Sequence, residues 1–234
     1  MTSRRELLKV VAAAGPAFNL GRPSSARAVS TGTIGRASRS LRILILGGTG
    51  FTGPYQVRYA VARGHHVTVF NRGRRQVDLP DSVEHLRGDR DIGDLKSLQG
   101  KPWDVVVDNP TTLPFWVRAA AAVLKGHVSQ YVFISTISVY ADVSKAGMDE
   151  DTPLLKYTGR DAMAETAESI RGRSQLYGQL KAISEATAQQ SFPGRTTVIR
   201  PGLIVGPGDD TDRFTYWPAR LDRGGEILAP GEPN

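Results

Sequence analysis

The sequence predicts an α/β fold built on a doubly wound parallel sheet, and three observations support this prediction. Short apolar segments alternate with helical segments from residue 41 onward, as strands and crossover helices do. A glycine-rich turn links the first apolar segment to the first helical one. The chain has 234 residues, of which 40% are hydrophobic and 23% charged, so it is long enough for one large globular domain.

Six segments have the composition of buried strands. Leu41–Leu46 is apolar apart from one arginine, His66–Phe70 is rich in β-branched and aromatic residues, and three consecutive valines form the centre of Trp103–Asp108. Pro201 ends the last of the six segments, because proline cannot continue a strand ladder. We therefore expect strands at residues 41–46, 66–70, 83–86, 103–108, 130–135 and 196–200.

Three longer segments between these strands have helical character. Glycine follows the first two, at Gly64 and Gly126, and the third ends before Pro193 and Gly194. The middle segment contains four consecutive alanines, which are the strongest helix formers. We expect helices at residues 54–63, 113–125 and 173–190.

The first 28 residues are expected to be a signal peptide. Ser3–Lys9 resembles the twin-arginine export signal of bacteria, Val10–Leu20 is a modest apolar stretch, and Ala26–Ala28 offers a small-residue cleavage site. Residues 29–40 are rich in Ser, Thr and Gly and are expected to form a flexible linker before a domain at 41–234. This predicts a periplasmic or secreted protein. An ordinary basic N-terminus on a cytoplasmic protein is the alternative.

Composition excludes several classes of function. The formal net charge is +7, but residues 1–40 carry all of it except +1, so the folded body offers no electrostatic footprint for nucleic acid. No apolar stretch reaches the length of a membrane span. Cysteine is absent, and the histidines lack metal-ligand spacing, so no metal site is expected; they are His65, His66, His85 and His127.

The glycine-rich turn predicts a dinucleotide site. Gly47, Gly50 and Gly53 are spaced three apart between the first strand and the first helix. Such glycines permit a tight turn and let a diphosphate approach the main chain at the helix N-terminus. A plain glycine turn is the alternative. The residues expected to contact the cofactor here are Gly47, Thr49, Gly50, Phe51, Thr52 and Gly53.

The end of the second strand favours NADP over NAD. A carboxylate there would bind the ribose hydroxyls of NAD, but the chain has Asn71 and Arg72, followed by Arg74 and Arg75. Guanidinium groups suit a 2′-phosphate, and Arg72 is the preferred candidate. A solvated basic turn is the alternative, and NAD stays open. By analogy, Asp89 after the third strand is expected near the adenine.

A tyrosine and a lysine form the candidate catalytic pair. Tyr177 and Lys181 lie four residues apart in the third helix, so they share one face. A neighbouring ammonium lowers the pKa of a phenol and fits it for proton transfer. Ser135, Thr136 and Ser138 follow the fifth strand, where a hydroxyl can reach a substrate oxygen.

Together these motifs resemble the extended short-chain dehydrogenases/reductases of the NAD-dependent epimerase/dehydratase family, which have a Rossmann fold. The resemblance also rests on Tyr131–Tyr140, on Arg200–Gly202 and on Gly206–Asp209. It implies that Thr136 is the catalytic hydroxyl, Tyr177 the acid/base and Lys181 a ligand of the nicotinamide ribose.

The chain departs from the family pattern in two ways. Thr136 and Tyr177 are 41 residues apart, which is longer than usual, and the acidic stretch Asp149–Asp151 in this interval suggests a surface excursion. The chain also stops at Asn234, where the resemblance implies a further substrate lobe, so the lobe is expected to be truncated.

The expected function is that of an NAD(P)-dependent oxidoreductase or epimerase acting at a carbinol or carbonyl carbon. Its partner is expected to be a small-molecule substrate, with a sugar or sugar nucleotide as one candidate, and a homodimer stays open. The alternative is a dinucleotide-binding protein without turnover. RNA binding, known among chloroplast-type relatives of the fold, is disfavoured by the near-neutral body.

Overall fold

The computed structural model describes residues 34–109 and 112–228. The predicted signal peptide at residues 1–28 lies outside the described residues, so it stays a prediction. The described residues from Gly35 onward belong to one compact unit. Residues 35–40 of the expected linker are part of this unit: the Ala37 N–H donates to the Arg63 carbonyl at 2.9 Å, and the Ser40 hydroxyl donates to the Gly64 carbonyl.

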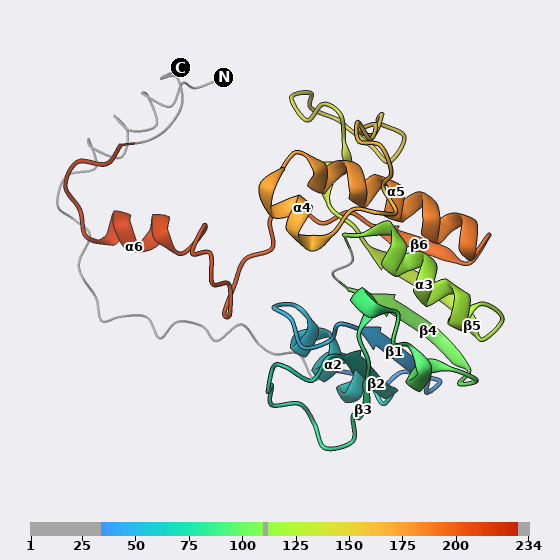
Figure 1. Ribbon diagram of the computed structural model, residues 1–234. Helices are drawn as coiled ribbons and strands as arrows, with labels where there is room; N and C mark the ends of the chain where they lie inside the picture. Colours follow the sequence, from blue (N-terminus) through green and yellow to red (C-terminus); the bar gives the residue numbers. More distant parts are fainter. Residues whose placement is uncertain (1–33, 110–111, 229–234) are drawn as a thin grey trace, which may run out of the picture. The chain divides into compact units, whose positions relative to one another are not determined.

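A parallel sheet with the strand order β3-β2-β1-β4-β5-β6 forms the centre of the unit (Figure 1). From β1 the chain moves outward to β3, then crosses back and moves outward again from β4 to β6. This reversal places a crevice at the carboxyl ends of β1 and β4 and confirms the doubly wound fold. The strands are β1 (Arg42–Leu46), β2 (His66–Asn71), β3 (Glu84–Arg87), β4 (Trp103–Asp108), β5 (Val128–Ile134) and β6 (Thr196–Ile199).

The three predicted helices are confirmed as α2 (Gly53–Ala62), α3 (Pro114–Leu124) and α5 (Leu176–Ser191). The prediction missed α4 (Ala167–Gly172) and α6 (Tyr216–Asp222), which are too short for a clear apolar period. A capping box joins Thr166 and Ser169 at the start of α4. Three single 3₁₀ turns complete the elements, namely η1 (Arg90–Ile92), η2 (Lys96–Leu98) and η3 (Ile137–Val139).

The two larger clusters of the core lie on opposite faces of the sheet, and a smaller one joins Leu113 to Leu176 and Leu180 of α5. Leu44, Phe133 and other sheet residues pack against α3 and α5 on one face. On the other face, Val57 of α2 packs among β1 and β2 residues such as Val69. Cover on this second face thins toward β6, where Ile199 is 46% exposed.

The interval between Thr136 and Tyr177 begins as an exposed loop, as the sequence predicts. Residues 141–151 are exposed with a single exception. The loop returns to the unit at an antiparallel bridge between Tyr140 and Leu154. The chain then reaches α5 next to η3, and the long interval thus leaves the end of β5 beside the start of α5.

Candidate functional site

The three spaced glycines of the β1–α2 loop have different surroundings. Gly47 makes the turn with a φ of 92°, which glycine adopts without strain. A Cβ at Gly53 would overlap the main chain of Gly48, so Gly53 lets α2 pack against the loop. A Cβ at Gly50 would meet only the Gly47 carbonyl oxygen, at 4.0 Å. Gly50 therefore has an open side, and it lines the adjacent cavity.

Asn109 connects the end of β4 to the start of α2. It is buried, its Nδ2 donates to Oε1 of Gln56 at 2.9 Å, and it lies 3.4 Å from the Thr52 hydroxyl. The side chain of Thr52, the N-cap residue of α2, makes no capping hydrogen bond. Asn109 was not among the predicted site residues, although it is a polar residue directly after a strand, as Ser135 and Thr136 are.

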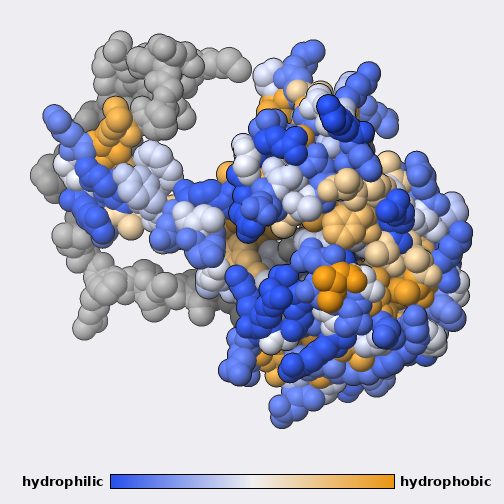
Figure 2. All heavy atoms as spheres, viewed as in Figure 1, coloured by the Kyte–Doolittle hydropathy of each residue, from blue (hydrophilic) through white to orange (hydrophobic). Residues whose placement is uncertain are grey.

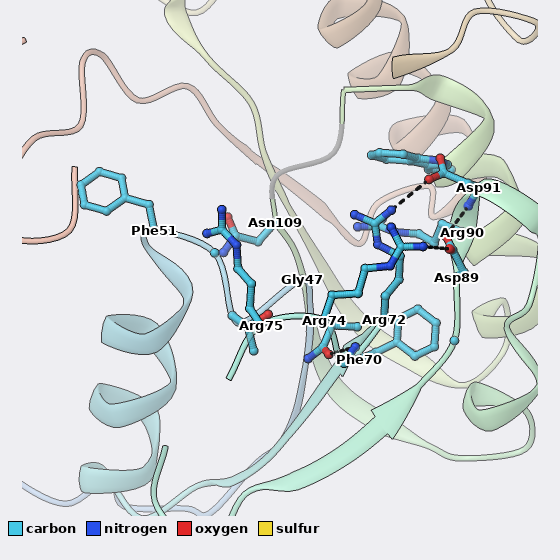
Figure 3. A pocket seen from close by; sticks show the side chains of 16 residues that line it. Gly47, Phe51, Phe70, Arg72, Arg74, Arg75, Asp89, Arg90, Asp91 and Asn109 are labelled. Carbon is cyan, nitrogen blue, oxygen red and sulfur yellow. Dashed lines mark hydrogen bonds and ion pairs between the residues drawn. The ribbon is translucent and has the colours of Figure 1, made fainter. Parts of the chain in front are cut away.

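A cavity of about 570 Å³ opens at the carboxyl ends of β1, β2 and β3 (Figure 3). In the view of Figure 1, the molecular surface is hollowed between the half with α2 and the half with α5, and hydrophilic residues predominate around the opening (Figure 2). The lining combines the glycine loop, the segment after β2 and the start of η1. The lining residues are Gly47, Thr49, Gly50, Phe51, Phe70, Asn71, Arg72, Gly73, Arg74, Arg75, Gly88, Asp89, Arg90, Asp91, Asn109 and Trp116.

The arginines after β2 have unequal partners. Arg72 lies 3.3 Å from Asp91, and Arg74 lies 3.9 Å from Asp89. Within the described ranges, Arg75 has no ion pair. Figure 3 shows it on the side of the glycine loop, away from the pairs that Arg72 and Arg74 form. Arg75 therefore has its guanidinium available for an anion in the cavity.

Asn71 and Asp89 also have structural contacts. Oδ1 of Asn71 accepts from the Gly73 N–H at 2.7 Å, which stabilises the turn after β2. Oδ1 of Asp89 accepts from the Asp91 N–H at 3.0 Å and caps η1. Both residues line the cavity as expected, but the Asn71 side-chain oxygen is already engaged, and the two carboxylate oxygens of Asp89 have the Asp91 N–H and Arg74 as partners.

Tight packing of α5 against η3 sets the position of Tyr177. A Cβ at Gly178 would overlap the carbonyl oxygen of Ser138, so only glycine permits this approach. Tyr177 directly precedes Gly178 in the first turn of α5 and is 38% exposed. Among the residues described, its hydroxyl has no hydrogen-bond partner, so it is available to a ligand.

Thr136 lies on the opposite side of this contact, at the carboxyl end of β5. Its Oγ1 accepts from the Ser138 N–H at 3.1 Å and lies 3.2 Å from the Ser138 hydroxyl. Thr136 is the residue before η3, the element that α5 touches, so Thr136 and Tyr177 belong to packed neighbours. No hydrogen bond joins the two hydroxyls in the part of the chain that the structure describes.

Lys181 lies one turn further along α5 and is buried, with 2% exposure. Its Nζ donates to the Ile134 carbonyl at 2.5 Å and lies 4.5 Å from the centre of the Phe133 ring. Burial lowers the pKa of Lys181 to about 8, and the nearby charges of Asp108 and Glu185 oppose this shift. The ammonium is therefore held at the end of β5, close to the segment with Thr136.

Arg200, from the Arg200–Gly202 motif, has a structural role. Its guanidinium donates to both oxygens of Glu185, at 3.0 and 2.8 Å, and to the Tyr140 hydroxyl at 3.1 Å. These bonds fasten the end of β6 to α5 and to the segment after η3.

The predicted site residues thus gather along one edge of the sheet in two groups. The cofactor candidates line the cavity, with three exceptions: Gly53 has a packing position, Thr52 lines a smaller neighbouring pocket, and Lys181 is buried beside β5. The catalytic candidates Thr136, Tyr177 and Lys181 form the second group, beside β5 and α5. Over the described ranges, no cluster of three or more potential metal ligands occurs, and no helix is long and apolar enough to cross a membrane.

Comparison with known proteins gives a consistent result. The model of the NAD dependent epimerase/dehydratase family matches residues 43–233. The chloroplast stem-loop binding protein of 41 kDa b from Arabidopsis thaliana is 29% identical over 209 residues, covering 83% of this chain and 50% of that protein. The 2′-dehydrokanamycin reductase of Streptomyces kanamyceticus is 28% identical, covering 74% and 46%.

Solved structures support the fold. A UDP-glucuronic acid 4-epimerase from Bacillus cereus, determined in complex with NAD, matches with a TM-score of 0.54 at 20% identity and covers 73% of this chain and 60% of its own. At this identity the likeness concerns the fold alone. The chain spans about half the length of the curated relatives that it matches.

Proposed function

The chain belongs to the NAD dependent epimerase/dehydratase family, and from this premise we propose that it is an NAD(P)-dependent oxidoreductase or epimerase acting at a carbinol or carbonyl carbon. One observation carries the proposal: Gly50 presents an open main-chain surface to the cavity, and Thr136, Tyr177 and Lys181 gather at the same edge of the sheet. An anion-binding loop and a proton-transferring pair are the two parts that this chemistry needs.

The residues divide the work as follows. When bound, the dinucleotide supplies the hydride chemistry. Thr136 donates a hydrogen bond to the substrate oxygen and holds it in reach of Tyr177. The Tyr177 hydroxyl gives or takes the proton at that oxygen, and the Lys181 ammonium favours the phenolate.

For the cofactor we propose NADP, with NAD as the alternative. The segment after β2 offers arginines where NAD enzymes of this fold commonly have a carboxylate. Arg72 is the candidate from sequence, and Arg75 joins it because its guanidinium has no acidic partner among the described residues. Either side chain can bind a 2′-phosphate through its fork of donors.

The further parts of the proposal concern substrate, location and assembly. We propose a small-molecule substrate, with a sugar or sugar nucleotide as the first candidate, and no nucleic-acid partner, because residues 41–234 carry a net charge of only +1. The N-terminal motif favours export to the periplasm or beyond, which would require a cofactor loaded in the cytoplasm. A homodimer is the candidate oligomeric state.

Two measurements test the proposal. Energy transfer from tryptophan to NADPH reports binding, because Trp116 lines the cavity. Absorbance of the reduced nicotinamide, followed across a panel of carbonyl substrates and sugar nucleotides, reports turnover. Tyr177→Phe is expected to abolish turnover and to leave dinucleotide affinity nearly intact. Binding without turnover on every substrate would favour the alternative, a dinucleotide-binding protein that is not an enzyme.

A further inference from the structure

A buried ionic cluster lies at the end of β4, outside the motifs that identify the family. Asp108 is fully buried. One carboxylate oxygen accepts from the Tyr131 hydroxyl at 2.5 Å, and the other lies 2.7 Å from a guanidinium nitrogen of Arg90. A buried carboxylate is costly unless it is paired, so this position requires an explanation.

The strand register brings Asp108 to Lys181. In the parallel pairing of β4 and β5, Asp108 lies opposite Phe133. Lys181 has its ammonium over the ring of that same Phe133 and on the carbonyl of the next residue, Ile134. The Tyr131 hydroxyl, from the same strand and face as Phe133, also reaches Asp108. The carboxylate and the ammonium therefore occupy the same face at the ends of two neighbouring strands.

Among the charged neighbours of Lys181, Asp108 does most to keep its ammonium protonated. Burial lowers the pKa of Lys181, and Asp108 opposes that effect more strongly than Glu185 does. Glu185 is already engaged by both ends of the Arg200 guanidinium. Arg90, from η1, also lowers the pKa of Lys181. The Tyr131 phenol adds no charge beside Asp108, because burial raises its pKa well above the usual value and keeps it neutral.

We propose that Asp108 is a positioning residue that holds the ammonium of Lys181 at the end of β5 and keeps it charged, so that it can act on Tyr177. This inference rests on the role proposed above for Lys181. Asp108 does not touch the reacting atoms. It acts through Lys181, with Tyr131 and Arg90 fixing the carboxylate in place.

Asp108→Asn tests the proposal, because it keeps the shape of the side chain and removes its charge. The chain has seven lysines, so labelling the lysine ε-carbon with ¹³C allows Lys181 to be titrated by NMR. We expect the pKa of Lys181 to fall by about one unit or more relative to the unmodified protein. Tyr131→Phe is the matched control: it removes one hydrogen bond and leaves the charge, so the pKa should stay near its original value.

A second variant covers the case in which Asp108→Asn does not fold. Arg90→Gln removes the cation that competes for Asp108, so the pKa of Lys181 should rise. An unchanged Lys181 pKa in folded Asp108→Asn, or in Arg90→Gln where Asp108→Asn does not fold, would overturn the proposal. The titration does not need turnover, so it is informative even if no substrate is found and the proposed function fails.

Where a substrate is found, the pH profile adds a second readout. The fall of kcat/KM at high pH should move to lower pH in Asp108→Asn by the same amount as the Lys181 titration. A pure loss of rate at all pH values, with no movement of this limb, would contradict the positioning role.

Discussion

The two halves of the sheet present different groups. In the half formed by β1, β2 and β3, a glycine main chain and exposed arginines face the cavity. In the half formed by β4, β5 and β6, Lys181, which is 2% exposed, lies near the fully buried carboxylate of Asp108. The first half depends on local backbone geometry. The second depends on the packing of α5 against the sheet. The two halves should therefore respond differently to substitution: the first by losing ligand affinity, the second by losing turnover and stability together.

The largest effect is expected from Gly178→Ala. The added methyl would overlap the Ser138 carbonyl and push α5 away from η3. Misplacing Tyr177 by about 1 Å should lower kcat about 100-fold, with a reduced melting temperature. Gly172→Ala is the matched control, because a Cβ there meets nothing within 4 Å. Equal kinetics in both variants would mean that the packing of α5 does not position Tyr177.

Gly50→Ala should affect binding without affecting the fold. The nearest atom to the added methyl is 4.0 Å away, so the thermal unfolding curve should be unchanged. The methyl would occupy the open side of the loop, and we expect NADPH affinity, measured by calorimetry, to fall about 10- to 100-fold. Gly53→Ala provides the contrast, since its methyl would overlap the Gly48 main chain and should destabilise the protein. A Gly50→Ala protein that binds NADPH normally would place the diphosphate elsewhere.

The pH dependence of kcat/KM should report the protonation of Lys181, in the half of the sheet formed by β4, β5 and β6. The pKa of Lys181 is lowered to about 8, so the ammonium is present below this pH and is lost above it. If Tyr177 needs the ammonium, kcat/KM should fall about tenfold between pH 7 and pH 9. Dinucleotide binding through the first half should change much less over this range. If kcat/KM did not change between pH 7 and pH 9, the protonation of Lys181 would not matter for the reaction.

The smallest effects are expected from the exposed arginines. Arg75→Ala should weaken NADPH about tenfold and leave NADH nearly unchanged, because a charge-assisted bond to the 2′-phosphate is lost. Arg72→Ala should have a smaller effect, since Arg72 is already paired with Asp91 at 3.3 Å. Arg74→Ala serves as the control for general charge loss. Equal weakening of NADPH and NADH would remove the phosphate-binding role.

The sequence predicted all six strands and the helices α2, α3 and α5, because continuous apolar segments and glycine or proline stops are local signals. It also predicted the glycine loop, since φ and the absence of a Cβ are properties of single residues. It missed α4 and α6, whose few residues carry no apolar period. Asn109 has the same local signal as Thr136, a polar residue after a strand, but its contacts with Thr52 and Gln56 depend on residues more than 50 positions away.

Local pattern thus determined the order of the elements, the cofactor loop and the spacing of Tyr177 and Lys181 on one helix face. Only the tertiary structure decided which arginine lacks an acidic partner in the described region, which glycine packs and which one faces the cavity, and that Asp108 lies beside Lys181. The physical reason is distance along the chain: Asp108 and Lys181 are 73 residues apart, and they meet only because β4 pairs with β5 and α5 packs over both.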